Sequence, residues 1–244
     1  MTDFAKVIDK AYGVEDRAGK AFLARMREQL RAEREWTYQH CLRVGEMARQ
    51  FALSIGVSEL AAENLGLVVS CHDIGKLSVP AELLDKVGEC TPKERAMRRD
   101  HSRQGGAMLE GHLSAPLLKL AAGVAENHHE KWDGTGYRHK AGKEIPVGAQ
   151  IAALCDVFDA SVSDRHYHVG APVINALSSI AGAKRNCFNP ELLKPFILYG
   201  VTANRNRLTG KDIARLMDQL EEGKNGPAGT GPVASGPRGS APRA

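Results

Sequence analysis

Apolar residues recur at helical spacing through most of the chain. One run contains Cys41, Val44, Met47, Ala48, Phe51 and Ala52, and the next extends from Leu60 to Val68. Residues three and four apart share one face of a helix, so both runs predict helices with one buried face. The same spacing predicts further helices over about 92–109, 115–126, 147–163, 172–183, 190–198 and 210–220. No segment alternates between apolar and polar residues as a half-buried strand does, and the sequence therefore predicts an all-α fold.

The chain divides into three parts by composition. Residues 1–35 are predicted to form an amphipathic helical extension that packs on the main bundle or contributes to a homodimer. The main helical domain is expected to cover 36–221, and its glycine- and charge-rich stretch at 130–146 is predicted to be a loop. Residues 222–244 are dominated by Gly, Pro, Ala and Ser. Such a segment cannot bury enough apolar surface to order itself, so a disordered tail is expected.

Composition and charge narrow the class of protein. Of the 244 residues, 43% are hydrophobic and 25% are charged, as in ordinary globular proteins. The net charge of +4 is modest and no basic stripe is interleaved with aromatic residues, which argues against a nucleic acid polymer as partner. No apolar run approaches the roughly 20 residues that a membrane helix needs, and no secretory apolar segment lies near the N-terminus. We therefore expect a cytoplasmic protein without a membrane span.

Seven residues suggest a metal site, and five of the nine histidines are among them. Imidazole nitrogens and carboxylate oxygens suit Fe, Mn or Zn, whereas Mg prefers a shell of oxygen atoms. A single histidine beside apolar neighbours is more often a satisfied core residue. Two adjacent pairs together with a helix-borne aspartate favour a metal site instead. The candidate ligands are His40, His72, Asp73, His101, His128, His129 and Asp156.

Several blocks of sequence, taken in order, resemble a known family. The blocks are His72-Asp73-Ile74-Gly75-Lys76 with Pro80 after it, His101 after a charged helix, His128-His129-Glu130 leading into Trp132-Asp133-Gly134-Thr135-Gly136-Tyr137, and Asp156-Val157-Phe158-Asp159-Ala160 followed by Arg165. Together they look like the HD-GYP branch of the HD phosphohydrolases. The resemblance covers about Thr37 to Leu198, and several blocks in one order are far more specific than a lone His-Asp pair.

The resemblance implies an HD-type helical bundle with a binuclear metal site in its core. His40, His72, Asp73 and Asp156 match the ligands of one metal, while His101, His128 and His129 match those of a second, with Asp73 bridging both. In this family the metals are iron or manganese more often than zinc.

The resemblance also implies an activity. The protein is expected to be a phosphodiesterase that hydrolyses cyclic di-GMP to pGpG, or onward to GMP, by attack of a metal-bridging hydroxide. Asp73 and Lys76 are the expected catalytic residues, and Lys76 would contact a phosphate oxygen. The expected substrate-binding residues are Lys76, Arg165, Tyr137 and His168.

The sequence departs from the family pattern in and near the namesake loop. Arg138 stands where the family has a proline, Gln150 where an arginine is usual, and His166 where a proline is usual. Loss of the proline is expected to make the loop more mobile, and the arginine adds a positive charge near the mouth of the site.

A further departure concerns the number of metals. Some family members bind a third metal through a glutamate one turn before the first histidine, but that position is Trp36. Glu35 points about 100° away on a helix, and Glu33 lies two turns off. We therefore expect two metals rather than three.

Cys41, Cys71 and Cys155 each adjoin a candidate ligand, yet none of the five cysteines forms a C-x-x-C pair. Neighbours on a helix point about 100° apart, so these cysteines are expected to be buried, reduced and apolar rather than ligands. Asp159 lies one turn after Asp156, where it either orients a metal-bound histidine or remains solvated.

Two other functions compete with the first. The chain is alternatively a degenerate sensor or scaffold that binds a cyclic dinucleotide, or a diguanylate cyclase or regulator protein, through the Gly136–Arg138 loop. The changes at Arg138 and Gln150 support this hypothesis. A third hypothesis keeps the enzyme class but changes the substrate to another cyclic dinucleotide, a nucleotide or an alarmone.

Overall fold

The structure is a computed structural model that describes residues 3–110, 114–164 and 169–225, and the regular elements within these ranges are all helices. The α-helices are α1 (Asp3–Tyr12), α2 (Arg17–Glu33), α3 (Glu35–Ser54), α4 (Glu59–Val69), α5 (Ala81–Leu84), α6 (Pro92–Arg99), α7 (His101–Glu110), α8 (Pro116–Asn127), α9 (Val147–Val162), α10 (Val173–Ala181), α11 (Pro190–Ala203) and α12 (Gly210–Asn225). The short 3-10 helices are η1 (Ile74–Ser78), η2 (Gly142–Glu144), η3 (Arg185–Cys187) and η4 (Arg205–Arg207). The predicted all-α fold is confirmed.

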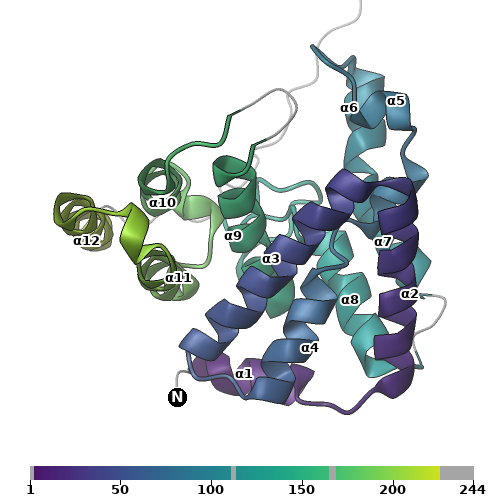
Figure 1. Cartoon of the computed structure of the whole chain (residues 1–244), viewed down its shortest axis with the longest axis horizontal. Coiled ribbons are helices and arrows are strands. Elements are labelled where there is room, and N and C mark those ends of the chain that lie inside the picture. The colour runs from purple at the N-terminus through teal and green to yellow at the C-terminus, as the bar shows by residue number, and fades with distance from the viewer. Residues whose placement is uncertain (1–2, 111–113, 165–168, 226–244) are drawn as a thin grey trace, which may run out of the picture.

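At the centre of the molecule α3 packs on α4, α7 packs on α8, and α9 contacts both α3 and α8 (Figure 1). The apolar face predicted for α3 is buried, and Val44 and Phe51 are fully inaccessible. Burial of such a side chain stabilises a fold by roughly 1.5–3 kcal/mol. Helices α3 and α4 approach so closely that a Cβ on Gly45 would lie only 2.6 Å from the carbonyl oxygen of Gly66. This approach brings His40 on α3 near the residues that follow α4.

The two N-terminal helices pack on this bundle. Helix α1 contacts α4, and α2 contacts α3, α8 and η1. Asp16 links two of these elements: Oδ1 accepts a 2.7 Å hydrogen bond from Gly19 N in α2, and Oδ2 accepts a 3.0 Å bond from Leu117 N in α8. Arg34 separates α2 from α3, next to the predicted domain boundary between residues 35 and 36. That division into domains remains a prediction.

The C-terminal helices form a second layer, in which α10 packs on α9, α11 and α12 (Figure 1). Helix α12 continues to Asn225, so residues 222–225 are helical and do not belong to the predicted tail. Once a helix is nucleated, each added residue gains one backbone hydrogen bond, which explains the extension beyond the apolar pattern. The rest of the predicted tail, 226–244, lies outside the described residues. None of the helices in the described ranges is long and apolar enough to cross a bilayer.

The single helix predicted over 92–109 is two helices, α6 and α7, which meet at Asp100. Thr91 and Glu94 form reciprocal capping hydrogen bonds at the start of α6. Helix α7 then lies directly against η1. The contact is so close that a Cβ on Gly75 would be 1.9 Å from the carbonyl oxygen of His101. Periodicity could not reveal this break, since both helices carry the same spacing. The close contact places His101 beside the segment that holds Asp73.

Candidate metal centre

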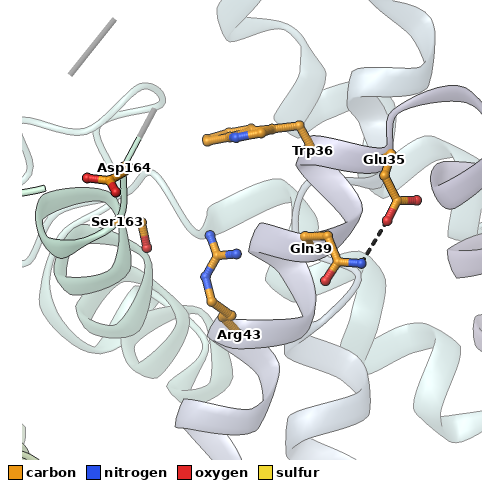
Figure 2. A pocket seen from close by; sticks show the side chains of 6 residues that line it. All are labelled: Glu35, Trp36, Gln39, Arg43, Ser163 and Asp164. Atoms are coloured by element: carbon orange, nitrogen blue, oxygen red, sulfur yellow. Dashed lines mark hydrogen bonds between the residues drawn. The ribbon is translucent and has the colours of Figure 1, made fainter. Parts of the chain in front are cut away.

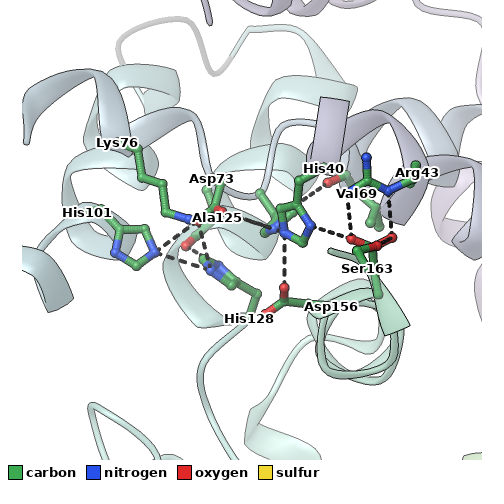
Figure 3. Close-up of polar contacts among 12 residues, drawn as sticks. His40, Arg43, Val69, Asp73, Lys76, His101, Ala125, His128, Asp156 and Ser163 are labelled. Carbon is green, nitrogen blue, oxygen red and sulfur yellow. Dashed lines mark hydrogen bonds and ion pairs between the residues drawn. The ribbon is translucent and has the colours of Figure 1, made fainter. Parts of the chain in front are cut away.

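The seven candidate ligands come from five places in the fold. His40 lies on α3, His72 and Asp73 connect α4 to η1, His101 starts α7, His128 and His129 follow α8, and Asp156 lies on α9. Figure 3 shows the side chains of His40, Asp73, His101 and His128 converging from these elements. Most of the side chains are buried, and His72 has no accessible surface. The structure therefore brings together residues that are far apart in the sequence.

Three of the histidines share one local arrangement. In each, Nδ1 donates a hydrogen bond to the backbone carbonyl three residues earlier: His72 to Val69 at 3.0 Å, His101 to Arg98 at 2.6 Å and His128 to Ala125 at 2.9 Å. A carbonyl oxygen can only accept, so the proton of each neutral ring must be on Nδ1. Each Nε2 is left with a lone pair directed toward the other ligands.

These lone pairs face one another without donors between them. The Nε2 atoms of His101 and His128 are 3.4 Å apart, and Asp73 Oδ1 lies 3.1 Å from His101 Nε2. Among the described residues, neither His72 Nε2 nor Asp73 Oδ1 has a hydrogen-bond partner, although both atoms are buried. Buried acceptors without donors are costly in a protein interior. A cation is the partner that this set of atoms fits, so the residues suit the divalent metals that the sequence predicts.

The described residues contain two groups with metal-ligand spacing, and Asp73 belongs to both. One group is His40, His72 and Asp73, and the other is Asp73, His101, His128 and His129. Within each group the ligand atoms lie within 4.8 Å of one another. Two cations that share one carboxylate require this arrangement. Asp156 belongs to neither group, and its Oδ1 instead lies 3.1 Å from His40 Nε2.

His40 is held by carboxylates on both ring nitrogens. Its Nδ1 lies 2.7 Å from Asp159 Oδ2, and Arg43 donates to both oxygens of Asp159 at 2.8 and 3.0 Å. Asp159 is buried, so of the two roles that the sequence leaves open the structure favours orientation of a histidine. Sequence analysis missed Arg43. The only available signal was that it lies three residues after His40, on the same helical face.

The electrostatics of this trio follow from the same contacts. Burial raises the pKa of Asp159, but hydrogen bonds from His40 and Arg43 outweigh it and lower the pKa to about 2. Burial lowers the pKa of His40, but hydrogen bonds to Asp156 and Asp159 outweigh it and raise the pKa to about 9. Burial lowers the pKa of His129 to about 2. His129 is therefore neutral and able to donate its lone pair.

Lys76 contacts Asp73 directly, through a hydrogen bond from Nζ to Oδ2. Burial raises the pKa of Asp73, but the Lys76 ammonium outweighs it and holds the pKa well below its usual range. Asp73 is thus ionised inside the core. The Lys76 side chain is 24% exposed and reaches the cavity beside the ligands, where its predicted phosphate contact would occur.

A cavity of about 830 Å³ opens beside the ligands His101 and His129. This volume lies in the range of small-molecule sites. Its wall contains several basic residues that sequence analysis did not single out, namely Arg34, Lys86, Arg95, Arg98 and Arg99. Three of them, Arg95, Arg98 and Arg99, come from α6, the charged helix before His101. Only the packing of α6 beside the site shows that these side chains line the cavity.

Two sets of contacts hold the glycine-rich loop at 130–146 in place. The buried Glu130 carboxylate accepts hydrogen bonds from the backbone N–H groups of Arg138 and Lys140, both at 2.9 Å. The Arg138 guanidinium pairs with Glu126. The expected extra charge at the mouth of the site is therefore paired, and the backbone is anchored where a mobile loop was expected. The sequence could not show the anchor because the Glu130 contacts form only in the folded loop.

Tyr137, which the sequence predicts to be a substrate contact, lines the cavity. Its ring centroid is 4.6 Å from that of His129, and the Arg99 guanidinium lies 5.0 Å from the Tyr137 ring centroid. Gln150, in contrast, donates to the Ile145 carbonyl at 2.7 Å and accepts from Asn189 at 2.8 Å. It links the end of the loop to α11. The predicted substrate residues Arg165 and His168, and the departure at His166, lie outside the described residues.

Both glutamates near Trp36 line the large cavity, but neither belongs to a metal-binding group of the described residues, and each is bound to a glutamine on its own helix. Glu33 accepts a hydrogen bond from Gln29 at 3.0 Å, and Glu35 accepts one from Gln39 at 2.7 Å. A second, shallower pocket of about 520 Å³ lies on this side, where the side chains of Trp36 and Arg43 face Ser163 and Asp164 (Figure 2).

The cysteines beside the ligands are buried and belong to neither metal-binding group of the described residues. Burial raises the pKa of the Cys71 thiol to about 12, and it also raises the pKa values of Cys41 and Cys155. A thiol with a raised pKa is a poor ligand, because the thiolate is the form that binds metals. All five cysteines are free, as the sequence predicts.

Comparisons with known proteins show what this chain is similar to. Residues 25–192 match the family described as the HD domain. A cyclic di-GMP phosphodiesterase of Thermotoga maritima is 35% identical over 162 residues, which are 66% of this chain and 44% of that protein. A 3'3'-cGAMP-specific phosphodiesterase of Vibrio cholerae is 31% identical over 180 residues, which are 73% of this chain and 40% of that protein. The chain thus spans less than half the length of these curated relatives.

One solved structure is also similar. It is an HDG"Y"P protein from Bdellovibrio bacteriovorus, with a TM-score of 0.54 and 16% sequence identity. The likeness covers 68% of this chain and 51% of that chain. At this level of identity the comparison shows a shared fold.

Proposed function

The chain belongs to the HD-GYP family of HD-domain proteins, and on this premise we propose that it is a metal-dependent phosphodiesterase that hydrolyses cyclic di-GMP to pGpG, or onward to GMP. The observation that carries the proposal is the convergence of histidine Nε2 lone pairs on the ionised Asp73, beside a cavity with a basic wall. The helical domain over 36–221 is then the catalytic domain.

The proposed cofactors are two divalent cations, iron or manganese in preference to zinc. His40, His72 and Asp73 would hold one, with Asp156 next to His40, and His101, His128 and His129 would hold the other with Asp73 shared. When bound, such a pair supplies an activated water and polarises the phosphate oxygens.

The chain's own residues perform the remaining tasks. Lys76 places its ammonium at the cavity wall, where it can neutralise charge that builds on a phosphate oxygen. The basic side chains of α6 attract an anionic ligand into the cavity. Asp159 and Arg43 hold the His40 ring in position. Tyr137 and, in the segment outside the described residues, Arg165 and His168 are proposed to contact the substrate.

The sensor or scaffold alternative receives no support from the two departures that suggested it. Arg138 pairs with Glu126, and Gln150 links Ile145 to Asn189, so both side chains lie outside the ligand groups. A protein partner at the Gly136–Arg138 loop and a homodimer remain predictions. Another cyclic dinucleotide remains a candidate substrate, because one relative is specific for cGAMP.

The proposal is tested with purified protein loaded anaerobically with Fe(II) or Mn(II). We expect the loaded protein to hydrolyse cyclic di-GMP. The products are identified by chromatography, and 3'3'-cGAMP is assayed in parallel. Asp73→Asn should lose turnover, because it removes the charge shared by both ligand groups. Glu46→Gln, an exposed carboxylate on α3, is the matched control. Binding of cyclic di-GMP without turnover in the loaded protein would contradict the proposed enzyme and favour the sensor.

A further inference from the structure

Trp36 is unusually exposed for a tryptophan. It lies near the start of α3 with 39% of its surface accessible, although tryptophan is highly buried on average. It lines both the large cavity beside the ligands and the shallower pocket beside Arg43 (Figure 2). An aromatic surface that stays accessible inside a concave site is typical of a ligand contact.

The indole also lies next to one of the proposed ligands. Its ring lies nearly parallel to that of His40, with 11° between the planes and 6.2 Å between the centroids. His40 is in turn held by Asp159 and Asp156. The Trp36 ring is thus a flat surface next to the first ligand group, supported by a side chain that is itself fixed.

Tyr137 has the corresponding position at the second ligand group. It is also 39% exposed, and its ring lies against His129 with 4.6 Å between the centroids. Among the described lining residues of the large cavity, Trp36 and Tyr137 are the aromatic side chains other than histidine. The rest of that lining is mainly charged, with six lysine and arginine side chains against the three carboxylates of Glu33, Glu35 and Asp85. The cavity therefore combines a basic wall with two flat rings, one beside each ligand group.

We propose that Trp36 is a stacking platform for one purine base of the cyclic dinucleotide, which makes it a specificity-determining residue. The inference rests on the proposed function. A cyclic dinucleotide carries two anionic phosphates and two flat bases, which match the basic wall and the two rings. Stacking requires only an aromatic face, so it favours large purines over smaller pyrimidines without reading their edges.

Fluorescence tests the contact directly. The chain has two tryptophans, Trp36 and Trp132, so a Trp132→Phe variant reports Trp36 alone. The Mn(II)-loaded variant is mixed rapidly with cyclic di-GMP, and emission is recorded before turnover proceeds. We expect quenching that saturates with ligand concentration. Unchanged emission while the same sample goes on to hydrolyse its substrate would overturn the inference.

Kinetics separate stacking from support of His40. Trp36→Leu keeps apolar bulk but removes the ring, and we expect KM to rise roughly 5- to 150-fold with little change in kcat or metal content. Trp36→Phe should stay within a few-fold of the wild type. The preference for cyclic di-GMP over cyclic di-UMP should shrink in the leucine variant. A loss of kcat and bound metal at unchanged KM would show instead that Trp36 merely positions His40.

The two proposals fail in different ways. If the loaded wild type hydrolyses cyclic di-GMP but Trp36→Leu has the wild-type KM, the stacking inference is wrong and the proposed function stands. If the wild type hydrolyses no cyclic dinucleotide, the proposed function is wrong. Quenching of Trp36 by cyclic di-GMP would then still support the platform, and its absence would refute it.

Discussion

The orientation of a single imidazole illustrates how this site is organised at the residue scale. His40 contacts Asp156 and Asp159 from α9, and Arg43 fixes Asp159 through two hydrogen bonds. A ring held in this way loses little freedom when it binds a cation, and its basicity is raised by the carboxylate behind it. The candidate centre therefore depends on residues that bind no metal themselves.

Replacing Asp159 tests this support. Asp159→Asn keeps the shape but removes the charge that faces His40 and Arg43. We expect affinity for Mn(II) to fall roughly 10- to 100-fold, measured by titration against a chelator. Ser163→Ala is the matched control, because Ser163 bonds the same carboxylate at 3.1 Å without touching His40. A wild-type affinity for Mn(II) in both variants would show that Asp159 has no orienting role.

Lys76 permits a second test at this scale. Lys76→Met removes the ammonium at the cavity wall, and we expect kcat for cyclic di-GMP to fall roughly 10²- to 10³-fold with metal content retained. Lys86→Met is the control, because Lys86 lines the same cavity but is bound to Glu94 at 2.7 Å. Loss of metal rather than of kcat would mean that Lys76 acts only by holding Asp73.

Contacts between elements place the ligands within reach of one another. Helix α7 lies against η1 because Gly75 has no side chain, and this contact brings His101 next to Asp73. Periodicity predicts the helices on either side of the contact, but it does not predict the break at Asp100 or the approach of the two backbones. Three of the candidate ligands, His72, His101 and His128, lie at or next to helix ends. Their positions therefore depend on where each helix begins or ends.

A methyl group on residue 75 should push η1 and α7 apart. Gly75→Ala would put a Cβ 1.9 Å from the backbone of His101, so η1 or α7 must move. We expect a loss of roughly 1–3 kcal/mol in the free energy of unfolding, seen in urea denaturation, together with weaker metal binding. Gly210→Ala serves as the control, because its Cβ would meet no atom within 4 Å. Wild-type stability in both variants would refute the close contact.

In the whole molecule, the bundle holds several electron-pair donors against one another at its centre. Without a cation, His72 Nε2 and Asp73 Oδ1 have no hydrogen-bond partner among the described residues. Their burial opposes folding, because each atom loses hydration that nothing replaces. The energy that the core gains elsewhere, for example at Phe51 and Val44, must offset this cost. Folding and metal binding should therefore be linked.

This linkage predicts a change in thermal stability. Mn(II) at a hundred times its Kd should stabilise the fold by about 2.7 kcal/mol per site, seen as a higher Tm in calorimetry. Asp73→Asn should show little of this shift, because Asp73 is common to both groups. A Tm that does not respond to Mn(II) in the wild type would contradict the linkage.

The amino-acid sequence alone was enough to predict an all-α protein, because helical periodicity is a local feature, and two adjacent ligand pairs with the order of the family blocks were enough to propose seven candidate ligands. It did not reveal which side chains support them. His40 and Asp159 are 119 positions apart, and Arg43 and Asp159 are 116 apart, so their contacts depend on how α3 packs against α9. The basic wall from α6 and the stacking of Trp36 on His40 likewise exist only once helices from distant parts of the chain pack together.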